Sequence, residues 1–254
     1  MQASQDNDKS APTSDEDTLP CVLSFNASDP VGAGGITSDT LVMASIGTHS
    51  LPISTGAYLR DTRETAGWIA ASPAAIEEQA RMVAEDVPIQ TIKVGFLGSA
   101  EAVAIVAAFT ADYAEAPVIT FLPDISWWDE SEIETYWDAV RDLLLPQTAV
   151  LVGNNTTLRH WLLPESATDR RARPVDLARA AAAFGVPYLL VTGLALEGER
   201  IGNVLASPDT ELLSQSYERI DAGFMGAGDI LSAAMAALLA NGSELTHAAA
   251  EALQ

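Results

Sequence analysis

The sequence predicts an α/β fold in which helices alternate with buried strands. Ala-rich runs of helical character are interrupted by short Val-, Ile- and Leu-rich runs, and 48% of the 254 residues are hydrophobic, which can supply a large core. We expect a three-layer α/β/α domain with a mostly parallel central sheet, in which ligands bind at the carboxyl ends of the strands. The pattern alone leaves other α/β topologies open.

Short runs of β-branched and aliphatic residues, bounded by Gly, Pro or polar residues, predict the strands. The expected strands are 21–25, 50–55, 91–98, 117–121, 149–152 and 186–193, followed by a β-hairpin formed by 201–205 and 211–220. The expected helices are 36–46, 73–85, 100–113, 131–145, 174–184, 230–240 and 245–253. Pro73 fits the first turn of its helix, Pro146 ends another, and Asn241-Gly242 is a stop signal.

The first 18 residues differ in composition from the rest. Residues 1–18 are rich in Ser, Asp, Asn and Gln and contain almost no apolar side chains, so we expect a disordered acidic tail. Residues 19–254 are expected to form the folded domain.

The charge and the cysteine content restrict the partners and the compartment. The chain has 35 acidic and 13 basic residues, a net charge of −22, which argues against nucleic acid or an anionic membrane as the main partner. Only two lysines occur, Lys9 and Lys93. The single cysteine, Cys21, excludes an internal disulfide and fits a reducing, cytoplasmic location. We expect neither a membrane-spanning segment nor a secretory leader.

A glycine-rich loop follows the first expected strand. Residues 28–39 read Ser-Asp-Pro-Val-Gly-Ala-Gly-Gly-Ile-Thr-Ser-Asp. Glycines between a strand and a helix allow the backbone to approach a ligand closely. No Gly-Lys-Ser/Thr follows, and the spacing is not a clean dinucleotide fingerprint. By itself the loop indicates either a ligand close to the backbone or a plain flexible turn.

A second stretch, Gly226-Ala227-Gly228-Asp229, leads into a long apolar helix. The first turn of a helix has unpaired N–H groups, and the helix dipole adds partial positive charge there. These donors could hold a phosphoryl group in transfer while Asp229 accepts the proton of an alcohol. The alternative is that Asp229 is an ordinary helix cap after an ordinary glycine turn.

Both stretches resemble motifs of the hydroxymethylpyrimidine/phosphomethylpyrimidine kinases, which belong to the ribokinase-like superfamily. Ser28–Asp39 is similar to their opening motif, Ser-Asp-Pro, a small residue, Gly-Gly-Ala-Gly-Ile, two residues and Asp, with the glycines locally permuted. Gly-Ala-Gly-Asp is similar to the superfamily's anion-hole and base signature. The pyrimidine kinases more often have Gly-Thr-Gly-Cys there, so Asp229 is closer to ribokinase and fructokinase usage. The resemblance covers residues 19–242.

This resemblance implies a ribokinase-like fold and ATP-dependent phosphorylation of the hydroxymethyl group of a small pyrimidine, or of its monophosphate, in thiamine biosynthesis or salvage. Asp229 would take the hydroxyl proton, while the N–H groups of Gly226, Ala227, Gly228 and Asp229 would stabilise the transferred group. The implied substrate pocket consists of Gly34, Asp39, Arg60 and Phe96, and the implied nucleotide side consists of Asn154, Thr192 and Gly193. Mg²⁺ would bridge the phosphates, mostly with water ligands. Relatives often form dimers, which leaves a homodimer as an option.

Several residues depart from the family pattern. Phe121 ends the strand that leads to an aspartate in the family, with Asp124 as a displaced candidate, and Thr157 stands where a glutamate helps to arrange the metal. Leu194 replaces a glycine. Arg60 replaces a ring-binding glutamine and is either a ring contact or a solvated loop charge. These departures leave two alternatives open: a kinase for pyridoxal or another heterocyclic alcohol, and a non-catalytic relative that binds a small heterocycle without using ATP.

Overall fold

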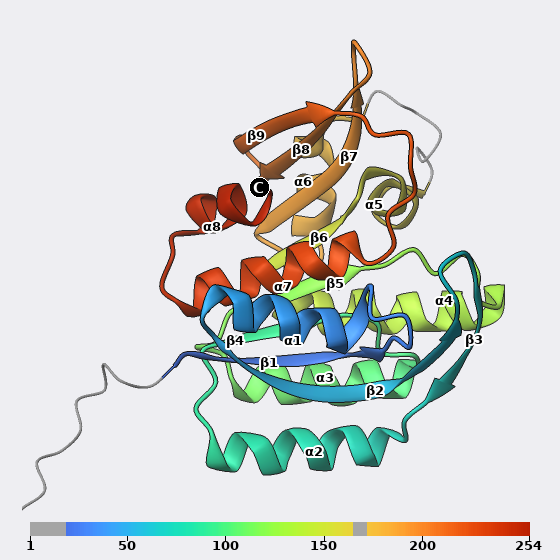
Figure 1. The fold of residues 1–254 in the computed structure, drawn as a ribbon, viewed down its shortest axis with the longest axis vertical. Coiled ribbons are helices and arrows are strands. Elements are labelled where there is room, and N and C mark those ends of the chain that lie inside the picture. Colours follow the sequence, from blue (N-terminus) through green and yellow to red (C-terminus); the bar gives the residue numbers. More distant parts are fainter. Residues whose placement is uncertain (1–18, 165–171) are drawn as a thin grey trace, which may run out of the picture.

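The structure is a computed structural model that describes residues 19–164 and 172–254. A sheet of nine strands runs through these residues in the order β3-β2-β1-β4-β5-β6-β7-β8-β9 (Figure 1). The strands are β1 Cys21–Ser28, β2 His49–Arg60, β3 Thr65–Ala70, β4 Thr91–Val94, β5 Val118–Leu122, β6 Val150–Asn154, β7 Tyr188–Leu196, β8 Arg200–Ala206 and β9 Glu211–Glu218. The expected tail at 1–18 lies outside the described residues.

The pairing of the strands is parallel in the centre and antiparallel at both ends. The six strands from β2 to β7 in this order run parallel to one another. The outer strand β3 pairs antiparallel with β2, and β8 and β9 continue from β7 as antiparallel strands. The expected hairpin before the last long helix is therefore present.

Helices cover both faces of the sheet. They are α1 Gly35–Ile46, α2 Pro73–Asp86, α3 Ala100–Asp112, α4 Glu130–Ala139, α5 Asn155–Leu162, α6 Pro174–Ala182, α7 Ala227–Ala240 and α8 Leu245–Ala252. A π turn at Val140–Leu144 and a 3₁₀ turn at Leu145–Gln147 extend α4. Within the described ranges, no helix has the length and apolar character needed to cross a membrane.

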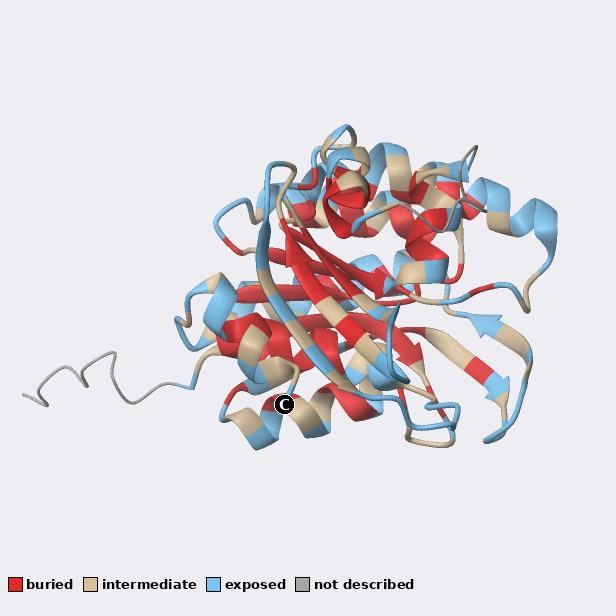
Figure 2. Ribbon diagram, turned by 90° about the horizontal axis from the view of Figure 1, so that it is seen from above, coloured by how far each residue is buried: buried red, intermediate tan, exposed pale blue. Residues whose placement is uncertain are grey.

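Two separate cores hold the layers together, because consecutive residues of a strand point to opposite faces. Leu23 belongs to the core shared with α2 to α6, whereas its neighbour Val22 belongs to the core shared with α1, α7 and α8. Leu189 and Leu190 divide in the same way. Figure 2 shows the central strands almost entirely buried between the helices. The prediction of a three-layer α/β/α fold is thereby confirmed.

Two elements were not predicted, and one was longer than predicted. The second strand continues to Arg60, where a loop was expected, and then pairs with β3, a short strand whose Gly67 weakens its sequence signal. Helix α5 was also missed. It begins after Asn154, whose side-chain oxygen accepts a hydrogen bond from the N–H of Thr157 at 2.8 Å, as an N-cap residue does.

The central position of α7 predicts that two methionines contribute very differently to the free energy of unfolding. Met235 on α7 is completely buried, whereas Met82 on α2 is 61% exposed. Met235→Ala should lower the free energy of unfolding by about 2–5 kcal/mol, because it removes buried methylene groups and leaves a cavity. The matched change Met82→Ala should alter it by no more than about 0.5 kcal/mol. Urea denaturation measures both, and equal losses would contradict the proposed core.

Candidate active site

The glycine loop after β1 lies directly against the start of α7. The N–H of Gly35 donates to Oδ2 of Asp229 at 3.0 Å, although the two residues are 194 positions apart. A Cβ atom on Gly226 would lie 1.8 Å from the carbonyl oxygen of Ala33, and one on Gly34 would lie 2.8 Å from Oδ2 of Asp229. Because Gly226 and Gly34 have no side chains, the two sequence motifs can pack against each other in one site.

Asp29 holds the glycine loop in shape. Its carboxylate accepts hydrogen bonds from the N–H groups of Gly34 at 2.8 Å and Val31 at 3.0 Å, and it forms an ion pair with Arg60. Burial of Asp29 raises its pKa, but the hydrogen bond and charge of Arg60 and the two N–H groups outweigh burial and hold the pKa below its ordinary value. Arg60 also lies over the ring of Tyr58. It is therefore a structural ion-pair partner rather than a solvated loop charge.

The first turn of α7 presents backbone donors beside Asp229. The first hydrogen bond within the helix joins the N–H of Ile230 to the carbonyl of Gly226 at 3.0 Å. The N–H groups of Ala227, Gly228 and Asp229 come before that bond, so the helix itself offers them no acceptor. Gly226 has a φ of 79°, in the left-handed region that favours glycine. This arrangement is typical of an anion-binding helix start.

Asp229 is surrounded by three donors. In addition to Gly35, its Oδ1 accepts hydrogen bonds from Nδ2 of Asn26 at 2.8 Å and from Nζ of Lys93 at 2.9 Å. The side chain of Asp229 remains 13% exposed, whereas that of Lys93 is completely buried. Lys93 also donates to both oxygens of Asp39, at 3.0 and 2.9 Å. Neither Asn26 nor Lys93 was predicted to belong to the site.

Asp39 lies behind this site and differs from the expectation that it faces a substrate ring. It is completely buried, and besides Lys93 it accepts hydrogen bonds from Oγ of Ser24 at 2.7 Å and Nδ2 of Asn26 at 2.9 Å. The reason is its position as the fifth residue of α1, where its side chain lies against Ser24 of β1 and Lys93 of β4. In this structure Asp39 anchors Lys93.

The buried charges shift one another's pKa values. Burial disfavours ionisation of Asp229, but the charge of Lys93 and the hydrogen bonds from Gly35, Lys93 and Asn26 outweigh burial, so the pKa of Asp229 lies below its ordinary value. Burial raises the pKa of Asp39; the charge of Lys93 opposes this effect and that of Asp229 adds to it. Burial alone would lower the pKa of Lys93, but the two carboxylates raise it. Asp229 is therefore an ionised carboxylate at neutral pH.

Phe96 is enclosed by other aromatic side chains. It is 1% exposed, and five rings have their centroids 4.9 to 5.8 Å from its own: Tyr58, Trp68, Trp127, Trp128 and Tyr136. A ring pocket at Phe96 was expected to be open to substrate, and here protein side chains fill it. The backbone of Phe96 nevertheless stays close to the site, because its N–H donates to Asn26 at 3.2 Å.

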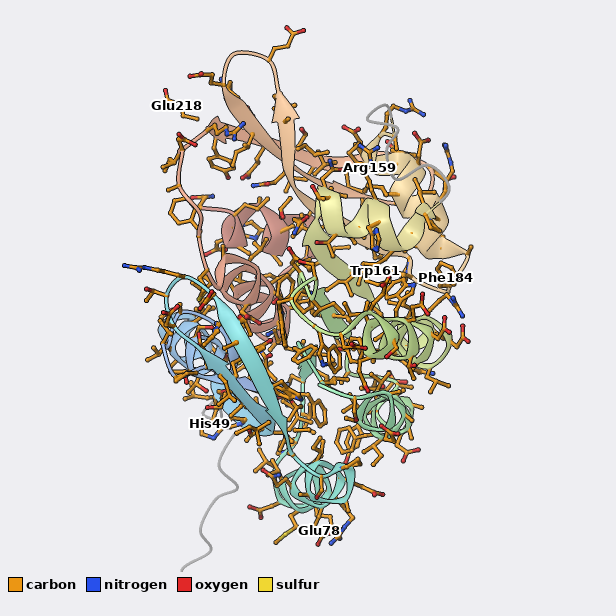
Figure 3. All side chains as sticks on the ribbon, turned by 90° about the vertical axis from the view of Figure 1, so that its right-hand side faces the viewer. His49, Glu78, Arg159, Trp161, Phe184 and Glu218 are labelled. Atoms are coloured by element: carbon orange, nitrogen blue, oxygen red, sulfur yellow. The ribbon has the colours of Figure 1, made fainter. Side chains whose placement is uncertain are left out.

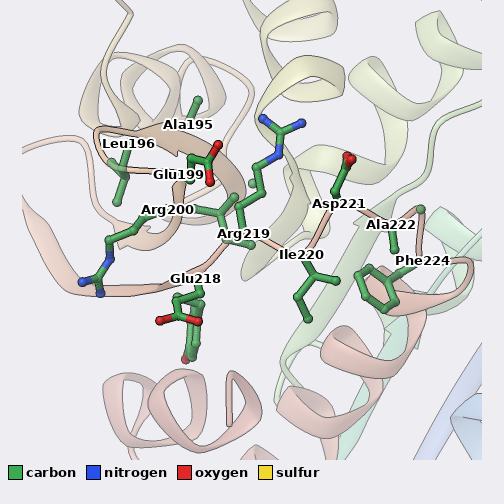
Figure 4. A pocket seen from close by; sticks show the side chains of 14 residues that line it. Ala195, Leu196, Glu199, Arg200, Glu218, Arg219, Ile220, Asp221, Ala222 and Phe224 are labelled. Carbon is green, nitrogen blue, oxygen red and sulfur yellow. The ribbon is translucent and has the colours of Figure 1, made fainter.

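A cavity of about 790 Å³ lies between β7–β9 and the segment that leads into α7 (Figure 4). Its lining includes Gly193, Arg200, Tyr217, Arg219 and Phe224. The positive φ of Gly193 coincides with a register shift in β7, and its N–H donates to Asn203 at 3.0 Å. Of the three expected nucleotide residues, only Gly193 lines this cavity.

A second cavity, of about 920 Å³, lies between α4 and α5, and its lining includes Asp124, Trp128, Asn154, Thr157 and Trp161. Figure 3 shows Trp161 on α5, far from Glu218, which lines the first cavity. Thr192 pairs with Asn154 in the sheet register, and its Oγ1 donates to the carbonyl of Gly153 at 3.3 Å. The structure thus brings Asn154 and Thr192 together on neighbouring strands, next to Gly193, although Asn154 and Gly193 line different cavities.

The family model of phosphomethylpyrimidine kinase matches residues 29–254. The chain belongs to this family. A curated relative, the hydroxymethylpyrimidine/phosphomethylpyrimidine kinase of Streptomyces coelicolor, is 30% identical over 235 residues, which cover 90% of this chain and 84% of the relative. A thiamine biosynthesis multifunctional protein of Corynebacterium efficiens is 26% identical over 231 residues, covering 90% of this chain and 31% of that protein.

Solved structures confirm the ribokinase-like fold of this phosphomethylpyrimidine kinase family member. An ADP complex of pyridoxal kinase from Bacillus subtilis has a TM-score of 0.79 at 21% identity, covering 93% of this chain and 89% of that one. At this identity the likeness concerns the fold. In the ranges that the structure covers, no group of three or more His, Cys, Asp or Glu side chains could hold a metal ion.

The contact between the two glycine motifs predicts different outcomes for two glycine substitutions. Gly226 and Gly47 both have a positive φ, but a Cβ on Gly47 would meet no atom within 4 Å. Gly47→Ala should cost about 1–2 kcal/mol of stability from backbone strain alone. Gly226→Ala should cost more, because its Cβ collides with the carbonyl of Ala33.

Urea denaturation and hydrogen exchange test this comparison. In Gly226→Ala the glycine loop must move, so the Gly35 amide should lose protection against exchange, whereas Gly47→Ala should leave it protected. Equal stability losses with an unchanged Gly35 amide would show that the two motifs do not depend on this contact.

Proposed function

We propose that the protein transfers the γ-phosphoryl group of ATP to the hydroxymethyl group of a small pyrimidine, hydroxymethylpyrimidine or its monophosphate, in thiamine biosynthesis or salvage. The observation that carries this proposal is the ionised carboxylate of Asp229 at the start of α7, in contact with the glycine loop after β1. Membership of the phosphomethylpyrimidine kinase family supports the reaction, and the name of the Corynebacterium relative supports the pathway.

Asp229 acts in this proposal as the general base. The alcohol gives its proton to the carboxylate, its oxygen bonds to the γ-phosphorus, and the bond from that phosphorus to the β–γ bridging oxygen breaks to release ADP. The pKa of Asp229 lies below its ordinary value, so it is a weak base that is fully ionised at neutral pH. This suits phosphoryl transfer, in which positioning and charge stabilisation contribute most of the catalysis.

The backbone at the start of α7 stabilises the group in transfer. The N–H groups of Ala227, Gly228 and Asp229, together with that of Gly226, point to the space where negative charge would develop, and the helix dipole has its positive end there. Since these donors belong to a packed helix, they need no rearrangement during the reaction.

The nucleotide fits the cavity beside β7–β9. That cavity ends at Phe224, which precedes α7 by only a few residues, so a nucleotide bound there could extend its phosphates toward Asp229. Its lining has two arginines, Arg200 and Arg219, beside three acidic residues, and Tyr217 and Phe224 supply aromatic surface for a base. Thr192 and the exposed Asn154 would lie along the phosphates.

Mg²⁺ belongs to the same proposal. The ion would be held by phosphate oxygens and water. Bound there, Mg²⁺ would neutralise phosphate charge. A cytoplasmic location and a homodimer are also proposed, and light scattering after size-exclusion chromatography measures the assembly.

The role of Asp229 predicts a large effect of removing its charge. Asp229→Asn should lower the kcat for ATP-dependent phosphorylation of hydroxymethylpyrimidine about 10²- to 10⁴-fold, because an amide cannot accept the alcohol proton. The matched change Asp86→Asn, at the exposed end of α2, should leave kcat unchanged. Coupled-enzyme kinetics measures ADP release, and full activity of Asp229→Asn would remove the base from the mechanism.

The acceptor is tested separately, because Arg60 and the filled space at Phe96 depart from the family's ring pocket. We expect hydroxymethylpyrimidine to give a higher kcat/KM than pyridoxal in the same assay. A preference for pyridoxal would reassign the acceptor. Binding of either heterocycle in calorimetry, without ATP consumption, would instead identify a non-catalytic relative.

A further inference from the structure

Lys93 has no role in the reaction described above, yet it is the most deeply placed charge in the site. Its side chain is completely buried, and its ammonium group has three N–H donors. Oδ1 of Asp229 at 2.9 Å and the two oxygens of Asp39 at 3.0 and 2.9 Å are its acceptors. Lys93, on β4, therefore connects the start of α7 to Asp39 on α1.

The two oxygens of the Asp229 carboxylate accept different numbers of hydrogen bonds. A carboxylate has about four lone-pair positions, two on each oxygen. Oδ1 accepts from both Lys93 and Asn26, so it has no position left, whereas Oδ2 accepts only from Gly35. The remaining position on Oδ2 is the one that can receive a further hydrogen bond, from a substrate hydroxyl group.

Gly34 of the glycine loop packs closely against Oδ2 of Asp229. A Cβ on Gly34 would lie 2.8 Å from Oδ2 of Asp229 and 3.1 Å from Nη2 of Arg60. A side chain at position 34 would therefore crowd this oxygen. Lys93 and Asn26 thus hold Oδ1, while Oδ2 keeps one unused position on a side chain that remains 13% exposed.

We infer that Lys93 is a positioning residue that directs Oδ2 of Asp229 toward the alcohol, and that Asp39 keeps Lys93 in place. This inference rests on the proposed kinase function and names the atom that receives the proton. It also assigns Asp39 to the support of the base instead of to contact with the ring. Asn26 completes the support, because its Nδ2 donates to both carboxylates, at 2.9 Å to Asp39 and 2.8 Å to Asp229.

The two supporting charges should act on Asp229 in opposite directions. Lys93 favours the ionised form of Asp229, while the negative charge of Asp39 disfavours it. The other titratable groups whose charges interact across this site are Arg60, Tyr58, Asp29 and Tyr136. None of them is altered by substitution at position 93 or 39, so the direction of each effect can be attributed to the changed residue.

The test compares the pH dependence of kcat/KM in Lys93→Met and Asp39→Asn. Activity falls as the pH drops through the pKa of the base, so the acid limb of the profile reports Asp229. Lys93→Met should move this limb upward by about one pH unit or more, because an opposite charge within hydrogen-bond distance is lost. Asp39→Asn should leave it in place or move it downward.

Two further variants control for folding and for general charge effects. Lys93→Met/Asp39→Asn removes both opposite charges together, which avoids two unpaired buried carboxylates, and it should still move the acid limb upward. Arg81→Met removes a cation from an exposed ion-pair group on α2 and should leave the profile unchanged. A uniform loss of activity at every pH, without movement of the limb, would show that Lys93 is only a structural contact.

A second measurement does not depend on catalysis. In protein labelled with ¹³C-aspartate, the carboxyl resonance of Asp229 is the one that Asp229→Asn removes. Its titration midpoint should rise in the variants lacking Lys93, whether or not they phosphorylate an alcohol. If loss of Lys93 shifts the midpoint but the wild-type protein phosphorylates no acceptor, the kinase function alone is rejected. An active wild type whose Asp229 midpoint is unchanged by loss of Lys93 would overturn the inference.

Discussion

The site depends on one ion pair, between the buried ammonium group of Lys93 and the carboxylate of Asp229. These residues are 136 positions apart, and their 2.9 Å contact joins a central strand to the helix that closes the fold. A buried charge is costly without partners, so all three N–H groups of Lys93 must find acceptors at once. That requirement fixes the relative positions of α1, β4 and α7. The same geometry leaves one oxygen of Asp229 available to a ligand.

The glycines around this ion pair serve different physical purposes. Gly226 needs its positive φ and lies against the Ala33 carbonyl, which lets the two loops touch. Gly34 has an extended backbone that any residue could adopt, and its lack of a side chain allows it to lie close to Asp229. The two glycines are thus required for different reasons. Only the structure shows that Gly226 needs its backbone conformation as well as close packing, whereas Gly34 needs close packing alone.

Much of the fold could be predicted from the sequence, because strand and helix signals were local and strong. The buried strand at β1 and the long apolar helix at α7 are examples, and the contact between their flanking loops followed from recognising both motifs. β3 was missed because a six-residue strand containing Gly67 has a weak pattern. The role of Asp39 could not be predicted either. A position near the start of a helix allows both a ligand contact and a buried ion pair, and the choice depends on Lys93, 54 residues away.

Phe121, which departs from the family pattern, packs against the start of α7. Its ring lies against Gly228, where a Cβ atom would come within 2.2 Å of the ring carbons. The aromatic ring therefore packs beneath the first turn of α7, and while it is there position 228 must be glycine. Restoring an aspartate at position 121 alone would leave an unfilled space beneath the helix and add a negative charge near Asp229.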